Sequence, residues 1–392
     1  MTFNISSEKD ILKGENADIY FRRALKVLES ENIDDSITAE VTVSSFENPW
    51  VTFSGLDEII SLLKGKNIDL FALPEGTILP YRDMHGTPVP FISIRGKYRD
   101  IGLYETSILG FICQSSGIST AASLVRMACG DKPFFSFGIR RMHPSIAPMI
   151  DRAAYIGGAD GVSGSLGARI LGVEPVGTMP HALSLLLGDE KAWKSVASQT
   201  KSATVLIDTY DDEKFGALKA AGLLPNLKYV RLDTPASRRG NFANIIREVR
   251  WELDIRGFKD VKIMVSGGLT PQDIVVLRNA GADSFGVGTS IASGRTVDFS
   301  MDIVEIAGKP ITKKGKFSSR KEVLRCNKCH GVLVIPDGNR VPGCECGGRY
   351  ESLLVQYLKS GSVLIDDSPA AARNRAVSWI DSAIKKDGLE VK

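Results

Sequence analysis

The sequence lacks most features that would set it apart from ordinary globular proteins. Its 392 residues carry a formal net charge of only +3, which gives no general reason to expect nucleic acid or an anionic membrane as partner. No apolar run approaches the roughly 20 residues that a membrane-spanning helix requires. Residues 1–16 show no apolar core followed by a small-residue cleavage site, so we expect no signal peptide and a cytoplasmic protein.

Histidine is scarce, with only four in the chain. His181 stands in GTMPHALSLLLG, between a turn rich in glycine and proline and the apolar start of a helix. An imidazole there caps a helix, fills a pocket or takes part in chemistry.

Cysteine is also rare, and four of the six cysteines cluster late in the chain. They form C-x₂-C, fourteen intervening residues and C-x-C, at positions Cys326, Cys329, Cys344 and Cys346. Thiolates with this spacing predict a closed tetrahedral Zn²⁺ site of structural type, and the cytoplasmic setting disfavours disulfides. His330 could replace one sulfur, while Cys113 and Cys129 are interpreted as buried thiols in an apolar helix.

The chain is too long for one ordinary core, and its patterns predict three domains. Residues 1–130 are expected to form an α/β sandwich that ends in a long helix leading to the next domain. In residues 131–305, seven short apolar runs alternate with helical segments, which predicts an irregular parallel β/α barrel of about seven strands. Residues 306–392 hold a basic segment, the small zinc knuckle domain and a closing helix, with the option of packing back on the first domain.

Polar residues follow the predicted barrel strands at the ends where such barrels carry their active sites. They are Arg140, Arg141, Ser163, His181, Asp208, Arg231, Asp233, Ser266, Gly288 and Thr289. Arginine suits phosphate and carboxylate groups, and aspartate suits sugar hydroxyls or Mg²⁺. These residues therefore predict one polar pocket.

Two glycine loops give the strongest phosphate signal. In VSGGLTPQDI, Gly267 and Gly268 allow close backbone approach to an anion, and Thr270 is placed to cap the next helix. GVGTSI repeats the device at the next strand end. The pair predicts a phosphorylated ligand without specifying a reaction.

The ordered stretches DIYFRR, LPEGTI, SFGIRRMHP, GGADGVS, GTMPHAL, IDTYDD, RLDTP, SGGLTPQDI and GVGTSI resemble nicotinate phosphoribosyltransferase, most of all its compact prokaryotic branch. The resemblance covers roughly residues 10–310. It implies a type II phosphoribosyltransferase fold and transfer of phosphoribosyl from phosphoribosyl pyrophosphate to nicotinate, giving nicotinate mononucleotide and pyrophosphate. It also implies coupled ATP hydrolysis, Mg²⁺ on the pyrophosphate, and a homodimer or larger homo-oligomer with a shared active site.

The resemblance also assigns roles by position. Tyr20 would reach the partner subunit's base pocket, and His181 would be phosphorylated by ATP. The base, ribose and pyrophosphate would be bound by Phe137, Arg140, Asp160, Asp208, Arg231 and Asp233. The 5′-phosphate would be held by Ser266, Gly267, Gly268, Gly286, Gly288 and Thr289. Arg140 and Asp208 would join His181 as the catalytic residues.

This chain has Ala182 where many members of the family have serine after the histidine, which removes a possible hydroxyl contact. Lys314 and Lys316 are candidates for pyrophosphate contacts, with plain solvated charge as the alternative.

Three other functions compete with this interpretation. The basic segment 313–325 and the zinc module could bind nucleic acid, but the module has few aromatic residues for stacking on bases. Quinolinate phosphoribosyltransferase would release CO₂, need no ATP and require further cations for a second carboxylate. Nicotinamide is the third possible substrate, and the adjacent Arg140 and Arg141 favour an acid.

Overall fold

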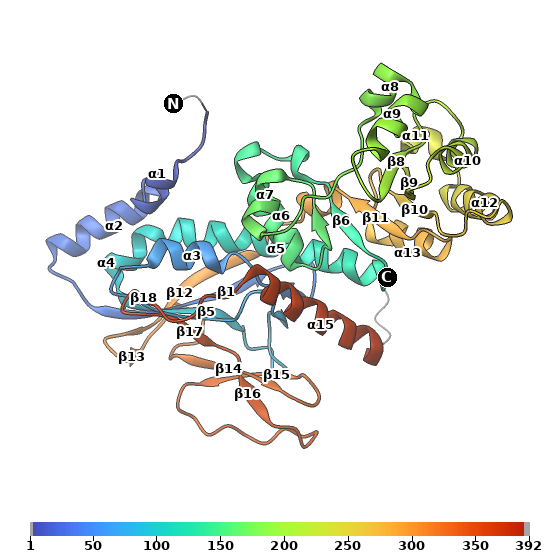
Figure 1. Ribbon diagram of the computed structural model, residues 1–392. Coiled ribbons are helices and arrows are strands. Elements are labelled where there is room, and N and C mark those ends of the chain that lie inside the picture. Colours follow the sequence, from blue (N-terminus) through green and yellow to red (C-terminus); the bar gives the residue numbers. More distant parts are fainter. Residues whose placement is uncertain (1–2, 388–392) are drawn as a thin grey trace. The chain divides into compact units, whose positions relative to one another are not determined.

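The computed structural model describes residues 3–387 and divides the chain into two compact units (Figure 1). Unit 1 contains Met1–Thr120 and Arg295–Ala376, and unit 2 contains Ala121–Gly294 and Val377–Lys392. The last few residues of the sequence and the first two lie outside the described part. The first strands and the cysteine segment therefore belong to the same unit.

Unit 1 is built on a seven-stranded antiparallel sheet. In spatial order its strands are β13 (Lys309–Pro310), β12 (Asp298–Ile306), β1 (Ser36–Ser45), β5 (Pro90–Lys97), β3 (Asp69–Ala72), β17 (Val355–Lys359) and β18 (Ser362–Val363). The register of β1 against β12 pairs Ile37 with Ile306 and Val43 with Phe299. A short ribbon pairs β2 (Trp50–Thr52) with β4 (Ile78–Pro80).

Helices cover one face of this sheet, and the apolar core lies between the two layers. Figure 1 shows α3 (Leu56–Leu63) and the first part of α5 (Glu105–Cys129) on that face. The remaining helices of the unit are α1 (Glu8–Leu12), α2 (Ile19–Ser30), α4 (Tyr98–Ile101) and the beginning of α15 (Pro369–Asp387). In the core, the Phe91 ring packs at a steep angle against Phe53 and Phe299, with ring centroids 5.7 and 5.2 Å away.

One helical stretch among the described residues, Tyr98–Cys129, is long and apolar enough by composition to cross a membrane. However, 61% of its most apolar window is buried inside the protein, as expected for a core helix. Buried hydroxyl groups on α5 also accept hydrogen bonds from the backbone of β2 and the residues after it: the Ser54 N–H donates to Ser116 Oγ at 3.1 Å, and the Thr52 N–H donates to Thr120 Oγ1 at 3.0 Å. Its composition therefore reflects core packing.

The cysteine segment forms a three-stranded sheet of its own, in the order β15 (Val332–Pro336), β14 (Lys321–Cys326) and β16 (Tyr350–Ser352). A buried ion pair ties it to the large sheet. Lys321 Nζ lies 2.7 Å from Glu40 Oε2, and the Lys321 N–H donates to Glu40 Oε1 at 3.0 Å. Burial raises the pKa of Glu40, and the Lys321 ammonium group offsets part of that effect.

Several other cations of the basic segment are also held by carboxylates of unit 1. Asp302 on β12 pairs with Lys313 and, at 2.8 Å, with Lys316, while Arg320 pairs with Glu305. The predicted alternative of a solvated Lys316 is therefore replaced by an intramolecular ion pair.

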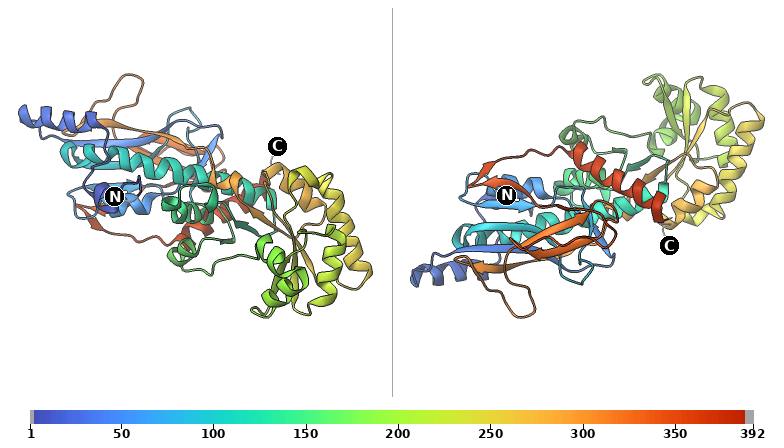
Figure 2. Two further views of the ribbon diagram at one scale, coloured as in Figure 1. Left: turned by 90° about the horizontal axis from the view of Figure 1, so that it is seen from above. Right: turned by 90° about the horizontal axis from the view of Figure 1, so that it is seen from below.

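Unit 2 is a curled sheet of six parallel strands flanked by helices. In spatial order the strands are β7 (Gly161–Val162), β6 (Phe134–Ser136), β11 (Ser284–Val287), β10 (Lys262–Val265), β9 (Leu227–Leu232) and β8 (Ala203–Leu206). The helices are α6 (Ala147–Ile156), α7 (Ser165–Leu171), α8 (His181–Leu187), α9 (Asp189–Ala197), α10 (Glu213–Leu223), α11 (Ala236–Arg239), α12 (Phe242–Ile255), α13 (Pro271–Asn279) and α14 (Thr289–Ala292). Figure 2 shows these helices around the strands of unit 2. The expected mixed α/β class with a parallel second sheet is confirmed.

One of the seven predicted strands, the third along the chain at residues 174–179, does not form. The Val176 N–H donates to the Val162 carbonyl at 2.8 Å, but no ladder continues from that bond. Pro175 and Pro180 have no N–H to donate, which explains why the segment stays extended without pairing. The sheet therefore remains open between β7 and β8.

We expect the Glu40–Lys321 pair to be essential for docking the cysteine segment. The substitution Lys321→Met should lower the free energy of unfolding by about 3 kcal/mol, because it leaves a buried carboxylate uncompensated. Lys314→Met in the same segment removes an exposed charge and should have almost no effect. Urea denaturation followed by circular dichroism compares the two variants, and equal losses would contradict the assignment.

Candidate active site

The carboxyl ends of the strands in unit 2 bring several predicted residues together. Asp208 follows β8, Asp233 follows β9 and Ser266 follows β10. The Asp233 N–H donates to Asp208 Oδ2 at 2.7 Å, and Ser266 Oγ donates to Asp233 Oδ1 at 2.7 Å. Three successive strand ends are thus connected by polar contacts.

Arg231 on β9 is the centre of this network. Its Nε donates to Ser266 Oγ at 2.9 Å and its Nη2 donates to Asp233 Oδ2 at 3.0 Å. Its Nη1 donates to Thr178 Oγ1 at 2.7 Å, which holds the extended segment before α8 against β9. Thr178 was not predicted from the sequence, because an isolated threonine in a loop carries no distinctive signal.

His181 is the first residue of α8 and lies at the edge of the same network. Its Nδ1 is 3.1 Å from Thr209 Oγ1, and its Nε2 is 3.9 Å from Asp233 Oδ2. The side chain is 41% exposed, so a ligand can reach the ring.

Asp208 combines burial with an unused acceptor. Its Oδ2 accepts from Asp233 N–H and from Thr234 Oγ1, at 2.7 and 2.9 Å. Its Oδ1 is buried and has no hydrogen-bond partner within residues 3–387. Burial raises the pKa of Asp208, while the hydrogen bonds and the nearby His181 oppose the rise. An unsatisfied buried oxygen at a strand end is available for a ligand hydroxyl or cation.

A cavity of about 370 Å³ adjoins this network. It is lined by Phe137, Ile139, Arg140, Ser163, Gly177, Thr178, Met179, Pro180 and Arg231. The centre of the Arg231 guanidinium lies 5.4 Å from the centroid of the Phe137 ring. A flat aromatic acid could stack on Phe137 while its carboxylate meets Arg231 and Thr178. Arg140 is exposed, and it lines the same cavity.

Gly286 on β11 creates the space for the Phe137 ring. A Cβ atom at this position would lie 2.5 Å from Phe137 Cε2. The Phe137 N–H donates to the Val287 carbonyl at 2.8 Å, which fixes the backbone beside that glycine. The sequence placed Gly286 in a phosphate loop, whereas its contact in the structure is with the ring.

The two predicted phosphate loops have the expected local structure. Gly267 and Gly268 have φ values of +95° and +69°, and their N–H groups donate no hydrogen bond within the described chain. Thr270 caps α13 in a reciprocal capping box with Asp273. Ser290 Oγ donates to the Leu269 carbonyl and so joins this loop to the one that begins at Gly288 and Thr289.

The structure does not bring two predicted residues into this cluster. Asp160 Oδ2 pairs with Arg126 at 2.8 Å and accepts the Phe134 N–H at the amino end of β6, the opposite end of the strands. Tyr20 lies on α2 of unit 1 and is exposed.

The four cysteines of the late cluster are close enough to share a metal ion. Their sulfur atoms all lie within 4.8 Å of one another, and they belong to Cys326, Cys329, Cys344 and Cys346. Backbone N–H groups donate to two of the sulfurs, from Lys328 to Cys326 at 3.5 Å and from Gly331 to Cys329 at 3.4 Å. Such bonds stabilise thiolates, so the donor set fits a metal that prefers sulfur.

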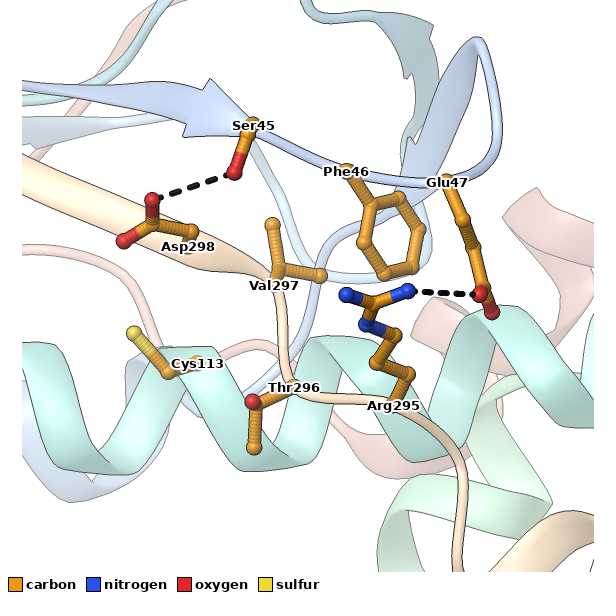
Figure 3. Close-up of a pocket in the computed structure, with 8 residues that line it drawn as sticks. All are labelled: Ser45, Phe46, Glu47, Cys113, Arg295, Thr296, Val297 and Asp298. Carbon is orange, nitrogen blue, oxygen red and sulfur yellow. Dashed lines mark hydrogen bonds and ion pairs between the residues drawn. The ribbon is translucent and has the colours of Figure 1, made fainter.

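A larger cavity of about 580 Å³ lies in unit 1 at the end of β1 (Figure 3). Arg295 pairs there with Glu47 at 3.3 Å, and Ser45 donates to Asp298 at 3.2 Å. Its polar groups therefore bind one another, and the cavity contains none of the predicted site residues.

Comparisons with known proteins agree with the fold. A family model of the quinolinate phosphoribosyl transferase N-terminal domain matches residues 18–116, and the model of the C-terminal domain matches residues 118–302. A nicotinate phosphoribosyltransferase of Mycobacterium tuberculosis is 31% identical over 323 residues, which cover 77% of this chain and 70% of that protein.

Two solved structures extend the comparison. The crystal structure of nicotinate-nucleotide pyrophosphorylase from Pyrococcus furiosus is 45% identical, covers 100% of both chains and has a TM-score of 0.92. The human nicotinic acid phosphoribosyltransferase has a TM-score of 0.72 over 92% of both chains at 18% identity, which shows the shared fold.

The fold is that of a type II phosphoribosyltransferase. Within that class, the chain belongs to the nicotinate phosphoribosyltransferase family.

The close contact at Gly286 gives a prediction about pocket packing. Gly286→Ala should lower the free energy of unfolding by about 1–3 kcal/mol, because the new methyl group overlaps the Phe137 ring. Gly177→Ala is the matched control, since a Cβ atom there meets nothing within 4 Å. Thermal unfolding of both variants tests this, and an unaffected Gly286→Ala protein would show that the ring is not held against β11.

Proposed function

We propose that the protein transfers phosphoribosyl from phosphoribosyl pyrophosphate to nicotinate, producing nicotinate mononucleotide and pyrophosphate in a first step of NAD salvage. The main support is the cavity in which Phe137, Thr178 and Arg231 meet, since these groups match a flat ring that carries one carboxylate. The homologous enzymes named nicotinate phosphoribosyltransferase support the same substrate.

The proposed roles follow from the contacts. Arg231 and Thr178 would bind the carboxylate of nicotinate, and Asp208 and Asp233 would bind the ribose. The free N–H groups of Gly267 and Gly268 would bind the 5′-phosphate. Arg140 would face the pyrophosphate, together with Mg²⁺ that accompanies this donor. Positive charge there stabilises the leaving group more in the transition state than in the ground state.

ATP hydrolysis would be coupled through phosphorylation of His181. Thr209 engages Nδ1, so Nε2 is the atom available to accept the phosphoryl group. We further propose structural Zn²⁺ on the four cysteines, a cytoplasmic location, and a homodimer or larger homo-oligomer in which Tyr20 of one subunit completes the other's base pocket. Asp160 pairs with Arg126, so we propose that it does not contact the base and affects base binding only indirectly, by holding β6 in place.

Quinolinate is the second candidate substrate, because both family models carry its name and the Pyrococcus furiosus protein is called a nicotinate-nucleotide pyrophosphorylase. Its additional carboxylate would need another cation. Arg140 and Arg231 are the two cations that line the described cavity, and Arg231 already pairs with Asp233. This charge count favours nicotinate.

Product formation distinguishes the two substrates. The purified protein with Mg²⁺ and phosphoribosyl pyrophosphate should convert nicotinate to its mononucleotide, faster with ATP than without. Quinolinate in the same assay should give no product and no CO₂. Chromatography of the nucleotides measures both reactions, and activity on quinolinate alone would overturn the proposal.

The proposed phosphohistidine gives a separate prediction. His181→Ala should abolish ATP stimulation and the acid-labile phosphate that ATP transfers to the protein. His143→Ala, which removes an exposed histidine of the same unit, should keep both. Mass spectrometry after incubation with ATP provides the measurement. A His181→Ala enzyme with full ATP stimulation would rule out this mechanism.

A further inference from the structure

A buried carboxylate that the proposed reaction does not use lies behind the base pocket. Asp151 on α6 is 0% exposed, and its Oδ2 accepts the Gly164 N–H at 3.1 Å. Its Oδ1 is buried and has no hydrogen-bond partner among the described residues. Burial raises the pKa of Asp151 to about 6. A half-satisfied buried carboxylate lowers stability, so its presence calls for a functional explanation.

Two glycines shape the space around this carboxylate. A Cβ atom on Gly167 would lie 2.5 Å from Asp151 Oδ2, and one on Gly164 would overlap the same oxygen. Ile139 Cδ1 would be 3.1 Å from that same Cβ atom on Gly164. The carboxylate and Ile139 therefore both pack closely against Gly164.

Both neighbours of this contact form walls of the cavity that contains Phe137. Ser163 directly precedes Gly164, and Ile139 belongs to the 3-10 turn Ile139–Arg141 that also carries Arg140. The Ser163 N–H donates to the Ser136 carbonyl at 3.1 Å, which fixes the turn on the side of β6. Asp151 supplies the second fixed point, through the Gly164 N–H.

We propose that Asp151 is a positioning residue of the base pocket. By accepting the Gly164 N–H, Asp151 fixes the backbone next to Ser163 and the packing of Ile139. Because both residues line the cavity, this sets the width of the pocket that is available to the substrate ring. Asp151 itself does not touch the substrate. This inference rests on the proposed function, in which the cavity binds nicotinate.

The test compares two substitutions of nearly equal size. Asp151→Leu removes the acceptor, and Asp151→Asn keeps an oxygen that can accept the Gly164 N–H. Asp151→Leu should raise the KM for nicotinate about tenfold, because small displacements of a binding wall have large effects on substrate positioning. The KM for phosphoribosyl pyrophosphate should stay within about twofold, and Asp151→Asn should restore the KM for nicotinate.

Asp283→Leu is the matched control for general loosening of unit 2. Its Oδ2 accepts the Ile263 N–H at 2.9 Å, near the amino ends of β10 and β11 and away from the cavity. This variant should leave both KM values unchanged. If Asp151→Leu does not fold, Asp151→Ala removes the acceptor with less apolar bulk and serves in its place.

The outcomes separate this inference from the proposed function. Equal KM values for nicotinate in the wild-type and Asp151→Leu proteins would overturn the positioning role, as would a parallel rise in both KM values. An equal rise in the Asp283→Leu protein would also overturn it. If the wild-type protein does not use nicotinate, the proposed function itself fails.

Discussion

The candidate site depends on the hydrogen bonds of one guanidinium group. Arg231 is anchored on β9, and its three nitrogens bind a strand end, a carboxylate and a loop that belongs to no strand. Because an arginine cannot lose its charge, a largely buried one requires a carboxylate, and Asp233 supplies it. The contact with Thr178 then determines where the segment before α8 lies. His181 follows three residues later, so its position is set by the same group.

The hydrogen bond from Arg231 to Thr178 also holds a segment that was expected to form a strand. Residues 174–179 were predicted as a barrel strand because a short apolar run stands there between two helical segments, as at the other predicted strands. Pro175 and Pro180 remove N–H donors that a ladder needs, and Thr178 binds a side chain instead of a neighbouring backbone. A short apolar run in a sequence predicts burial, but it does not reveal which groups will bond to the backbone N–H and carbonyl groups of that segment.

Most polar site residues were predictable because they directly follow strands of a parallel sheet. Asp208, Asp233 and Ser266 meet for that reason. Asp160 obeys the same rule of strand direction. It precedes β7 and therefore lies at the amino ends of the strands, away from the cluster at their carboxyl ends. Its family-based assignment to the base pocket did not take this end of the strand into account. Thr178 and Asp151 were not predictable, since their roles depend on contacts rather than on residue type.

The basic segment shows that a run of positive charges in a sequence does not by itself indicate a polyanion partner. Its cations suggested a polyanion partner, yet Lys321, Lys316 and Lys313 pair with carboxylates on β1 and β12. Glu40 precedes Lys321 by 281 positions, so this pairing was invisible before folding. A buried pair also contributes little to nucleic-acid binding, because its charges are already neutralised.

The electrostatics around His181 bear on how ATP could drive the proposed reaction. A phosphoryl group on Nε2 would place negative charge beside Asp233, whose Oδ2 lies 3.9 Å from that atom. Two unit charges about 4 Å apart repel by roughly 4 kcal/mol at an effective dielectric constant of about 20. The phosphorylated enzyme would therefore need added positive charge, and a donor that arrives with Mg²⁺ would provide it. On this argument the nearby carboxylate would make a phosphohistidine reactive, and Ala182 offers no hydroxyl that would stabilise it.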